Sequence, residues 1–219
     1  MTLDTKPSRF PFLEPDKIRR AAVVCHRNAD PDAYLSAYAL SGLIRRLAPK
    51  CTVEIVTPGG MTTLTQKLGA IFLHPRVETS SEEFDLYVAV DVGDEELLDD
   101  WKEKMRESKG MKVLVDHHPL REGTTYDKVV VDEGATSAGE VVFALYQELG
   151  AEMDDRTAQA LLEAIMFDSS HLAIASPSAL RVVVKLMDLG ADVPLARKEL
   201  RGEPDYGEVL AKLKGAQRL

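Results

Sequence analysis

The sequence predicts an α/β protein with a doubly wound, mostly parallel five-stranded sheet, flanked by helices and followed by a C-terminal helical layer. Two patterns lead to this prediction. Short runs of β-branched residues alternate with helical patterns, which is typical of parallel strands connected by helices. From residue 155 onward the β-branched runs stop, and only helical patterns follow.

The expected strands are short apolar runs, most of which read as buried on both faces of the sheet. They are residues 21–25, 52–56, 85–90, 112–115 and 128–131. The expected helices have apolar residues three or four positions apart. They are residues 33–47, 63–69, 95–107 and 137–149, and then 155–167, 177–189, 193–200 and 205–217.

The 219 residues are expected to divide near residue 192. Residues 1–192 would form the sheet-containing domain, and residues 193–219 would form C-terminal helices at the point where a linker to a second domain would begin. Gly190 is typical of a helix end, and Pro194 is typical of the first turn of the next helix.

Composition narrows the function and the compartment. With 27 basic and 36 acidic residues the net charge is −9, the opposite of the positive field that holds long nucleic acid. Cys25 and Cys51 lie in or beside apolar runs, which favours buried thiols in a reducing compartment. The amino terminus lacks an apolar signal core, and no run approaches the roughly 18 apolar residues that span a bilayer. We therefore expect a cytoplasmic protein with no membrane partner.

Acidic and histidine residues follow four of the five expected strands. The carboxyl ends of parallel strands share one edge of a sheet, where ligands bind, so these side chains should converge. Each piece alone has a simpler interpretation. Asp30-Pro31 is a good helix start, Asp94 could cap the helix at residue 95, and a lone pair such as His117-His118 is more often surface or core than ligand.

The combination of these groups favours a metal site. Two unit charges about 4 Å apart repel by roughly 4 kcal/mol at an effective dielectric near 20, so converging carboxylates need protons or cations. Mixed carboxylate and imidazole ligands suit Mn²⁺, Fe²⁺, Co²⁺ or Zn²⁺, and enough of them are present for two ions.

Four segments resemble the signature motifs of the DHH phosphoesterase superfamily. They are HRNADPDAYLSA, VAVDVGD, VLVDHHP and EAIMFDSS, and they occur in the order of that superfamily over about residues 20–192. The superfamily includes RecJ-type exonucleases, nanoRNA and phosphoadenosine-phosphate phosphatases, cyclic-dinucleotide phosphodiesterases and family II inorganic pyrophosphatases. The resemblance implies that residues 1–192 are a metal-binding phosphoesterase domain.

The resemblance also implies a role for each motif residue. The metal ligands would be His26 and Asp30 for one ion, Asp32, His117 and Asp168 for the other, and Asp91 between them. His118 would face the scissile phosphate as a catalytic and substrate-binding group, and Asp116 would orient the two histidines. The implied cofactors are two divalent cations, with Mn²⁺ preferred and Mg²⁺ or Co²⁺ as alternatives.

Three further residues are candidate substrate contacts: Thr136, Ser137 and His171. The stretch GATSAGE suits a phosphate-binding helix start, but Ser137-x-x-Glu140 also matches a capping box. His171 could contact substrate or lie at the rim of the pocket. Many relatives carry Asp-Thr-Gly where this chain has Asp168-Ser169-Ser170, so the substrate preference stays open.

The resulting hypothesis is a phosphoesterase that hydrolyses a small nucleotide or a short oligonucleotide through a hydroxide activated by two metal ions. The alternatives are a RecJ-like single-strand exonuclease and a non-catalytic replication or repair scaffold of the same fold. Complete ligand positions favour an enzyme over a scaffold. The glycine-rich second domain usual in the superfamily is not found in the sequence. A second copy of this chain in an oligomer, or a partner protein, could supply that domain. Long nucleic acid would need such a partner.

Overall fold

The computed structural model describes residues 16–72, 76–78, 82–121 and 123–201. Its centre is a parallel sheet in the order β3-β2-β1-β4-β5-β6. The strands are β1 Arg20–Val24, β2 Thr52–Val56, β3 Arg76–Val77, β4 Leu86–Val90, β5 Met111–Asp116 and β6 Lys128–Val131. The predicted fold class is confirmed. The five predicted strands all form, and the two-residue β3, too short to give a sequence pattern, adds to one edge.

The helices also follow the predicted order. They are α1 Pro31–Leu47, α2 Thr63–Phe72, the 3₁₀ helix η1 Glu95–Leu98, α3 Asp100–Glu107, α4 Ala138–Glu148, α5 Asp155–Asp168, α6 Pro177–Asp188 and α7 Val193–Glu199. The single helix predicted over 95–107 is instead broken at Asp99, whose φ of 49° is left-handed. The helix predicted over 205–217 lies outside the described residues.

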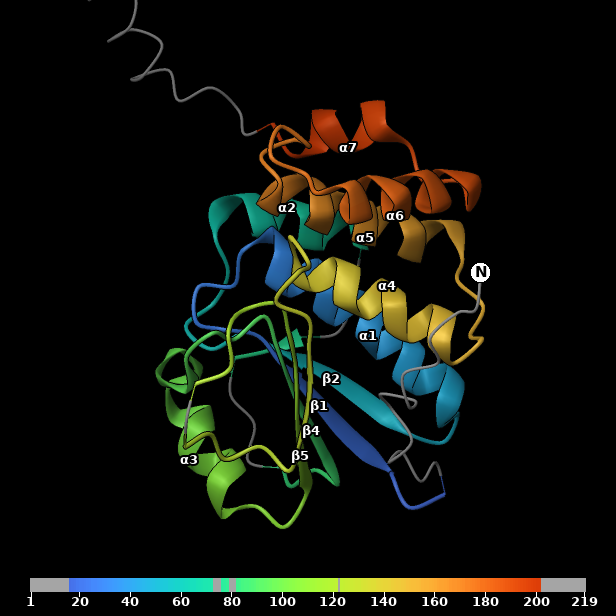
Figure 1. Ribbon diagram of the computed structural model, residues 1–219. Helices are drawn as coiled ribbons and strands as arrows, with labels where there is room; N and C mark the ends of the chain where they lie inside the picture. The colour runs from blue at the N-terminus through green and yellow to red at the C-terminus, as the bar shows by residue number, and fades with distance from the viewer. Residues whose placement is uncertain (1–15, 73–75, 79–81, 122, 202–219) are drawn as a thin grey trace, which may run out of the picture.

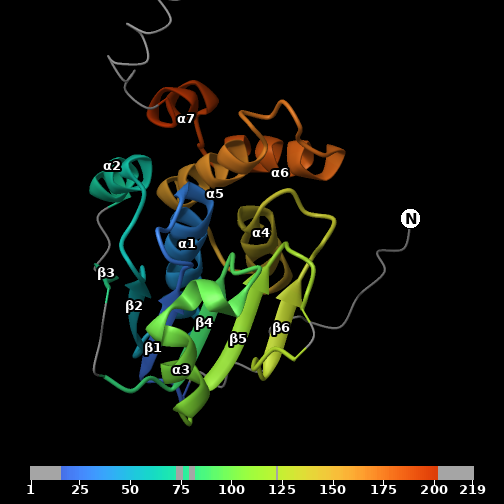
Figure 2. The same ribbon diagram turned by 90° about the vertical axis from the view of Figure 1, so that its left-hand side faces the viewer.

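Helices cover both faces of the sheet. Figures 1 and 2 show α1 and α4 on one face and α3 on the other. Side chains of β1 alternate accordingly: Ala21 and Val23 pack in the cluster with α1, α4 and α5, whereas Ala22 and Val24 pack with η1 and α3. The central strands are therefore buried on both faces, as their apolar runs predict.

The C-terminal helices form the predicted layer. Helix α5 packs on α1 and α4, and α6 and α7 pack in turn on α5 (Figure 2). The strand arrows in Figure 2 point toward this layer. The proposed division near residue 192 stays a prediction.

The strand order reverses between β1 and β4, which are neighbours in the sheet. The connection after β1 leads to one edge and the connection after β4 leads to the other, so a crevice opens at the carboxyl ends of these two strands. Cys25 and Cys51 are buried free thiols, as predicted. Among the described residues, no helix combines the length and apolar character needed to cross a membrane.

Candidate metal centre

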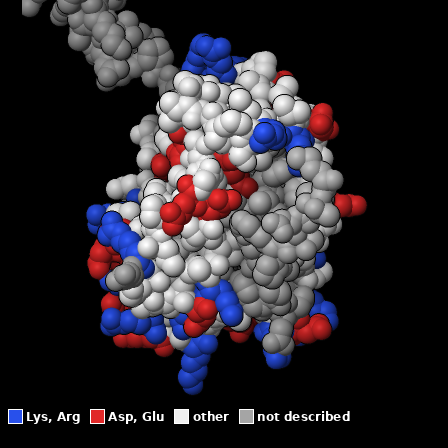
Figure 3. Space-filling model, in the orientation of Figure 1, with Lys and Arg blue, Asp and Glu red and all other residues white. Residues whose placement is uncertain are grey.

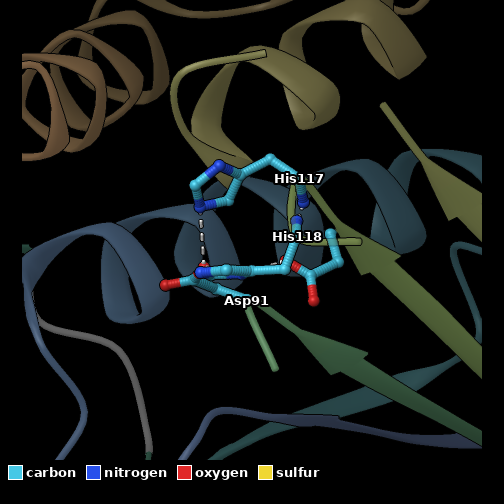
Figure 4. Close-up of side chains that lie close together, drawn as sticks. Asp91, His117 and His118 are labelled. Atoms are coloured by element: carbon cyan, nitrogen blue, oxygen red, sulfur yellow. Dashed lines mark hydrogen bonds and ion pairs between the residues drawn. The ribbon is translucent and has the colours of Figure 1, made fainter. Parts of the chain in front are cut away.

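Asp91 lies at the middle of this crevice, directly after β4. Its backbone is left-handed, with φ 56°, and its N–H donates to the Val115 carbonyl across to β5. One carboxylate oxygen, Oδ1, lies 3.3 Å from His117 Nε2, and the other, Oδ2, lies 4.0 Å from His26 Nε2. Figure 4 shows His117 pointing at Asp91 from the neighbouring strand end. The Asp91 carboxylate therefore lies between two imidazoles.

His26, Asp30 and Asp91 form the first ligand group, with one ligand atom from each within 4.8 Å of the others. His26 Nε2 is 3.6 Å from Asp30 Oδ1. His26 Nδ1 lies 2.8 Å from the Arg27 carbonyl, so the tautomer protonated at Nδ1 turns the Nε2 lone pair toward the carboxylates. Asp30 Oδ1 also accepts from the Ala33 N–H at 3.0 Å and caps α1.

Asp32, His117 and Asp168 form the second ligand group, again within 4.8 Å. His117 Nε2 is 3.4 Å from Asp168 Oδ2, at the end of α5. Asp32 is fully buried at the start of α1. These three side chains come from three separate elements, α1, α5 and the end of β5.

Asp32 has a second role that the sequence did not indicate. Its carboxylate accepts from the Ala138 N–H at 2.7 Å, the Gly139 N–H at 3.1 Å and the Ser36 hydroxyl at 3.1 Å. The N-terminus of α4 is therefore held by a carboxylate of α1. No local pattern signals this contact, because it joins residues more than a hundred positions apart.

Asp116 orients the two histidines that follow it. Its Oδ1 accepts from the backbone N–H groups of His117 and His118, at 2.7 and 3.2 Å, and lies 2.8 Å from His118 Nδ1. Gly93 leaves room for the His118 ring, since a Cβ at residue 93 would lie 3.0 Å from His118 Cγ. Asp116 therefore contacts the His118 ring and the backbone of both histidines, and its orienting role stays a prediction.

The electrostatics of the cluster favour a cation. Burial, followed by the charges of Asp91 and Asp168, raises the pKa of Asp32 well above its usual value. Burial and then Asp91 and Asp30 raise the pKa of Asp168 to about 6. Burial lowers the pKa of His26, but Asp30, the Arg27 carbonyl and Asp91 together outweigh burial and raise this pKa to about 9. The raised pKa values of the two carboxyl groups and of the His26 imidazole show that negative charge is in excess at this cluster.

The donor set fits a divalent cation. Asp91 Oδ1 and His117 Nε2 are buried and have no hydrogen-bond partner. Buried polar atoms without partners are rare in folded proteins, and a metal ion would satisfy both. Mixed carboxylate and imidazole ligands suit Mn²⁺, Co²⁺ or Zn²⁺.

A cavity of about 650 Å³ opens onto the ligands. It is lined by His26, Asp30, Asp91, Gly93, Asp94, Leu97, His118, Pro119, Leu120, Arg121 and Asp168. Figure 3 shows acidic side chains gathered in the middle of this face of the molecule. The volume is that of a small-molecule site. The sequence indicates only a capping role for Asp94, and the hydrogen bond of 3.1 Å from the Glu96 N–H to Asp94 Oδ1 confirms that role. The sequence does not indicate Arg121 as a cavity residue.

The other candidate substrate contacts do not line this cavity. Ser137 is fully buried and its hydroxyl accepts from the Glu140 N–H at 3.3 Å, while Glu140 Oε1 accepts from the Thr136 N–H at 2.7 Å. The predicted helix cap is therefore present. His171 is exposed in the turn after α5. Substrate binding by these residues stays a prediction.

Comparison with protein-family models matches residues 20–166 to the family described as DHH family, N-terminal domain. The chain belongs to the DHH family. This DHH-family chain is 27% identical to the bifunctional oligoribonuclease and PAP phosphatase NrnA of Bacillus subtilis over 155 residues. The aligned region covers 68% of the chain and 46% of that relative. It is also 27% identical over 211 residues to an uncharacterized protein of Methanocaldococcus jannaschii, covering 95% of the chain and 62% of the relative.

A solved structure has a similar fold. The crystal structure of an exopolyphosphatase-related protein from Bacteroides fragilis superimposes with a TM-score of 0.77 at 17% identity, covering 89% of this DHH-family chain and 60% of that protein. At this identity the likeness establishes the fold alone. The chain also spans less than two thirds of the length of both curated relatives.

Proposed function

We propose that this DHH-family chain is a metal-dependent phosphoesterase that hydrolyses a small nucleotide or short oligonucleotide phosphate ester. The observation that carries the proposal is the pair of ligand groups on either side of Asp91. His26 and Asp30 would hold one cation, Asp32, His117 and Asp168 the other, and Asp91 would contact both. Mn²⁺ is the preferred ion, with Mg²⁺ and Co²⁺ as alternatives.

Two cations held by these residues would supply an activated water and would neutralise charge on phosphate oxygens. The side chains of the chain supply position and charge. Asp116 Oδ1 accepts from His118 Nδ1–H, which leaves Nε2 as the ring nitrogen that would face a ligand at the cavity. The buried Asp91 and Asp32 keep the ligand oxygens in place before substrate arrives.

Two observations support a small substrate. The cavity of about 650 Å³ suits a nucleotide-sized ligand. The net charge of −9 works against long polyanions, which bind through broad basic surfaces. The names of the NrnA relative, oligoribonuclease and PAP phosphatase, describe substrates of this kind for that protein.

The test uses metal-stripped protein reloaded with Mn²⁺ and assayed on phosphoadenosine phosphate, dinucleotides, cyclic dinucleotides, pyrophosphate and single-stranded DNA. We expect hydrolysis of one of the small phosphate esters, and loss of turnover in Asp91→Asn with the fold retained by circular dichroism. Asp100→Asn, an exposed acid on α3, is the matched control and should keep wild-type activity.

Three outcomes contradict this proposal. If the Asp91→Asn variant keeps its turnover, the proposal that Asp91 contacts both cations is wrong. Cleavage confined to single strands longer than about ten nucleotides favours the RecJ-like exonuclease instead. Stripped protein that rebinds no Mn²⁺ favours a non-catalytic scaffold.

A further inference from the structure

Arg121 is the only lysine or arginine among the described residues that line the cavity. Four carboxylates, those of Asp30, Asp91, Asp94 and Asp168, line the same space. A cation pair on the ligand groups would balance the charge at one end of the cavity. A phosphate lying away from the ligand groups would meet uncompensated carboxylates unless the chain itself supplied positive charge there.

The chain delivers Arg121 to the cavity on the same loop as His118. Only Pro119 and Leu120 separate the two residues, and both also line the cavity. Proline fixes its own φ, which limits the conformations of this short connection. The imidazole and the guanidinium are therefore presented to one ligand from a single loop.

The guanidinium is held in an accessible position. Arg121 Nη1 donates to Asp94 Oδ2 at 2.6 Å, while Asp94 Oδ1 accepts the N–H that caps η1. The Arg121 side chain is 66% exposed, so this ion pair is screened by water and is weak. A guanidinium has five N–H donors arranged for bidentate contact with phosphate. Asp94 orients one end of this group and leaves donors for a ligand.

We infer that Arg121 binds a second phosphate of the substrate, one carried beside the phosphate that is hydrolysed. The inference rests on the proposed phosphoesterase function. Arg121 is then a specificity-determining residue, because it favours substrates with two phosphate groups over those with one.

The experiment compares two substrates that share one scissile ester, adenosine 3′,5′-bisphosphate and adenosine 3′-monophosphate. Steady-state kinetics are measured for Mn²⁺-loaded wild type, Arg121→Ala and Arg121→Lys. We expect Arg121→Ala to raise KM for the bisphosphate by about ten-fold or more, the effect of one lost charged hydrogen bond, with kcat little changed. KM for the monophosphate should stay near wild type. KM for the bisphosphate should be raised less in Arg121→Lys than in Arg121→Ala, because lysine keeps the positive charge but lacks the paired N–H donors of the guanidinium.

Arg106→Ala is the matched control, because Arg106 also pairs with a nearby acid, Glu103, but does not line the cavity. It should leave both KM values unchanged. Equal KM changes for the two substrates in Arg121→Ala, or a fall in kcat alone, overturns the inference.

Calorimetric titration of bisphosphate into the metal-loaded proteins separates this inference from the proposed function. If wild type hydrolyses neither substrate but binds the bisphosphate more tightly than Arg121→Ala does, the phosphoesterase proposal fails and the Arg121 contact stands. Equal binding by the two proteins, or no binding by either, overturns the Arg121 contact.

Discussion

The two ligand groups are built differently. His26 and Asp30 come from one turn of chain after β1, and the Asp30 side chain is 30% exposed. Asp32, His117 and Asp168 come from α1, the end of β5 and the end of α5, and Asp32 is completely buried. His26 and Asp30 are local in sequence, whereas the second group exists only when α5 has packed against α1 and α4.

This contrast shows what each group depends on. A short motif and a helix cap arrange His26 and Asp30, and the pairing of β1 with β4 brings Asp91 to them. The second group is linked to helix packing, because Asp32 also holds the N-terminus of α4. Changes in the first group should affect metal binding alone, and changes in the second should affect both metal binding and stability.

The largest expected effect comes from removing one ligand of each group. We expect wild type to bind two Mn²⁺ ions per chain, and each of the variants His26→Ala and Asp168→Asn to bind one. The activity of each variant should fall more than about hundred-fold, because even residues that only contact metal ligands contribute ten- to hundred-fold. Metal content after desalting is the measurement. Loss of both ions in His26→Ala would show that the groups are not independent.

A smaller effect should separate Asp32 from Asp30. Each change to asparagine removes one charge and one metal ligand, and this loss of stability is common to both variants. Because asparagine caps a helix as well as aspartate does, Asp30→Asn should lower the unfolding free energy by less than about 0.5 kcal/mol beyond that common loss. Asp32→Asn turns an amide NH₂ toward the α4 N–H groups and should cost about 1–3 kcal/mol more. Denaturant unfolding of the two variants under identical metal conditions measures the difference, and equal midpoints would contradict the second role of Asp32.

A third effect, on stability and not on metal binding, concerns the packing of α5, which carries Asp168. Glu163 on α5 is fully buried, and its Oε2 and Glu199 Oε2 on α7 have no hydrogen-bond partner. Burial, followed by Glu199, raises the Glu163 pKa to about 9. The unfolded chain releases this proton near the usual value of 4.5 and the folded chain near 9. The stabilisation is therefore complete below pH 4.5 and decreases as pH rises toward 9.

Glu163→Gln removes this titration. Unfolding free energy measured between pH 5 and pH 9 should fall less steeply in the variant than in wild type, because residue 163 no longer titrates. Parallel curves would show that Glu163 ionises normally in the folded chain.

Much of the fold was predictable because its signals are local. The β-branched runs and the caps at Asp30 and Ser137 are read from neighbouring residues, and the doubly wound order follows from strands alternating with helices. Convergence of His26, Asp91 and His117 was predictable for the same reason, since each directly follows a strand. Asp168 is the last residue of helix α5, and only the family resemblance indicated it as a ligand.

The remaining features depend on contacts between distant residues or on backbone geometry. Asp99 breaks the helix predicted over 95–107 with φ 49° and ψ −133°, a backbone conformation that the residue type does not predict. The hydrogen bonds from α4 to Asp32 and the pairing of Arg121 with Asp94 join segments whose distance in space is set by the whole fold. No local pattern carries that information.

The turn after Asp168 limits how this site can change. Ser170, His171 and Leu172 are consecutive left-handed residues, with φ of 51°, 58° and 72°. Valine, isoleucine and threonine are strongly disfavoured in that conformation, whereas glycine, asparagine and aspartate are accepted. Random mutagenesis should therefore recover few branched residues in this turn, and selection for new substrates would draw its variation from segments without this constraint, such as the loop that carries Arg121.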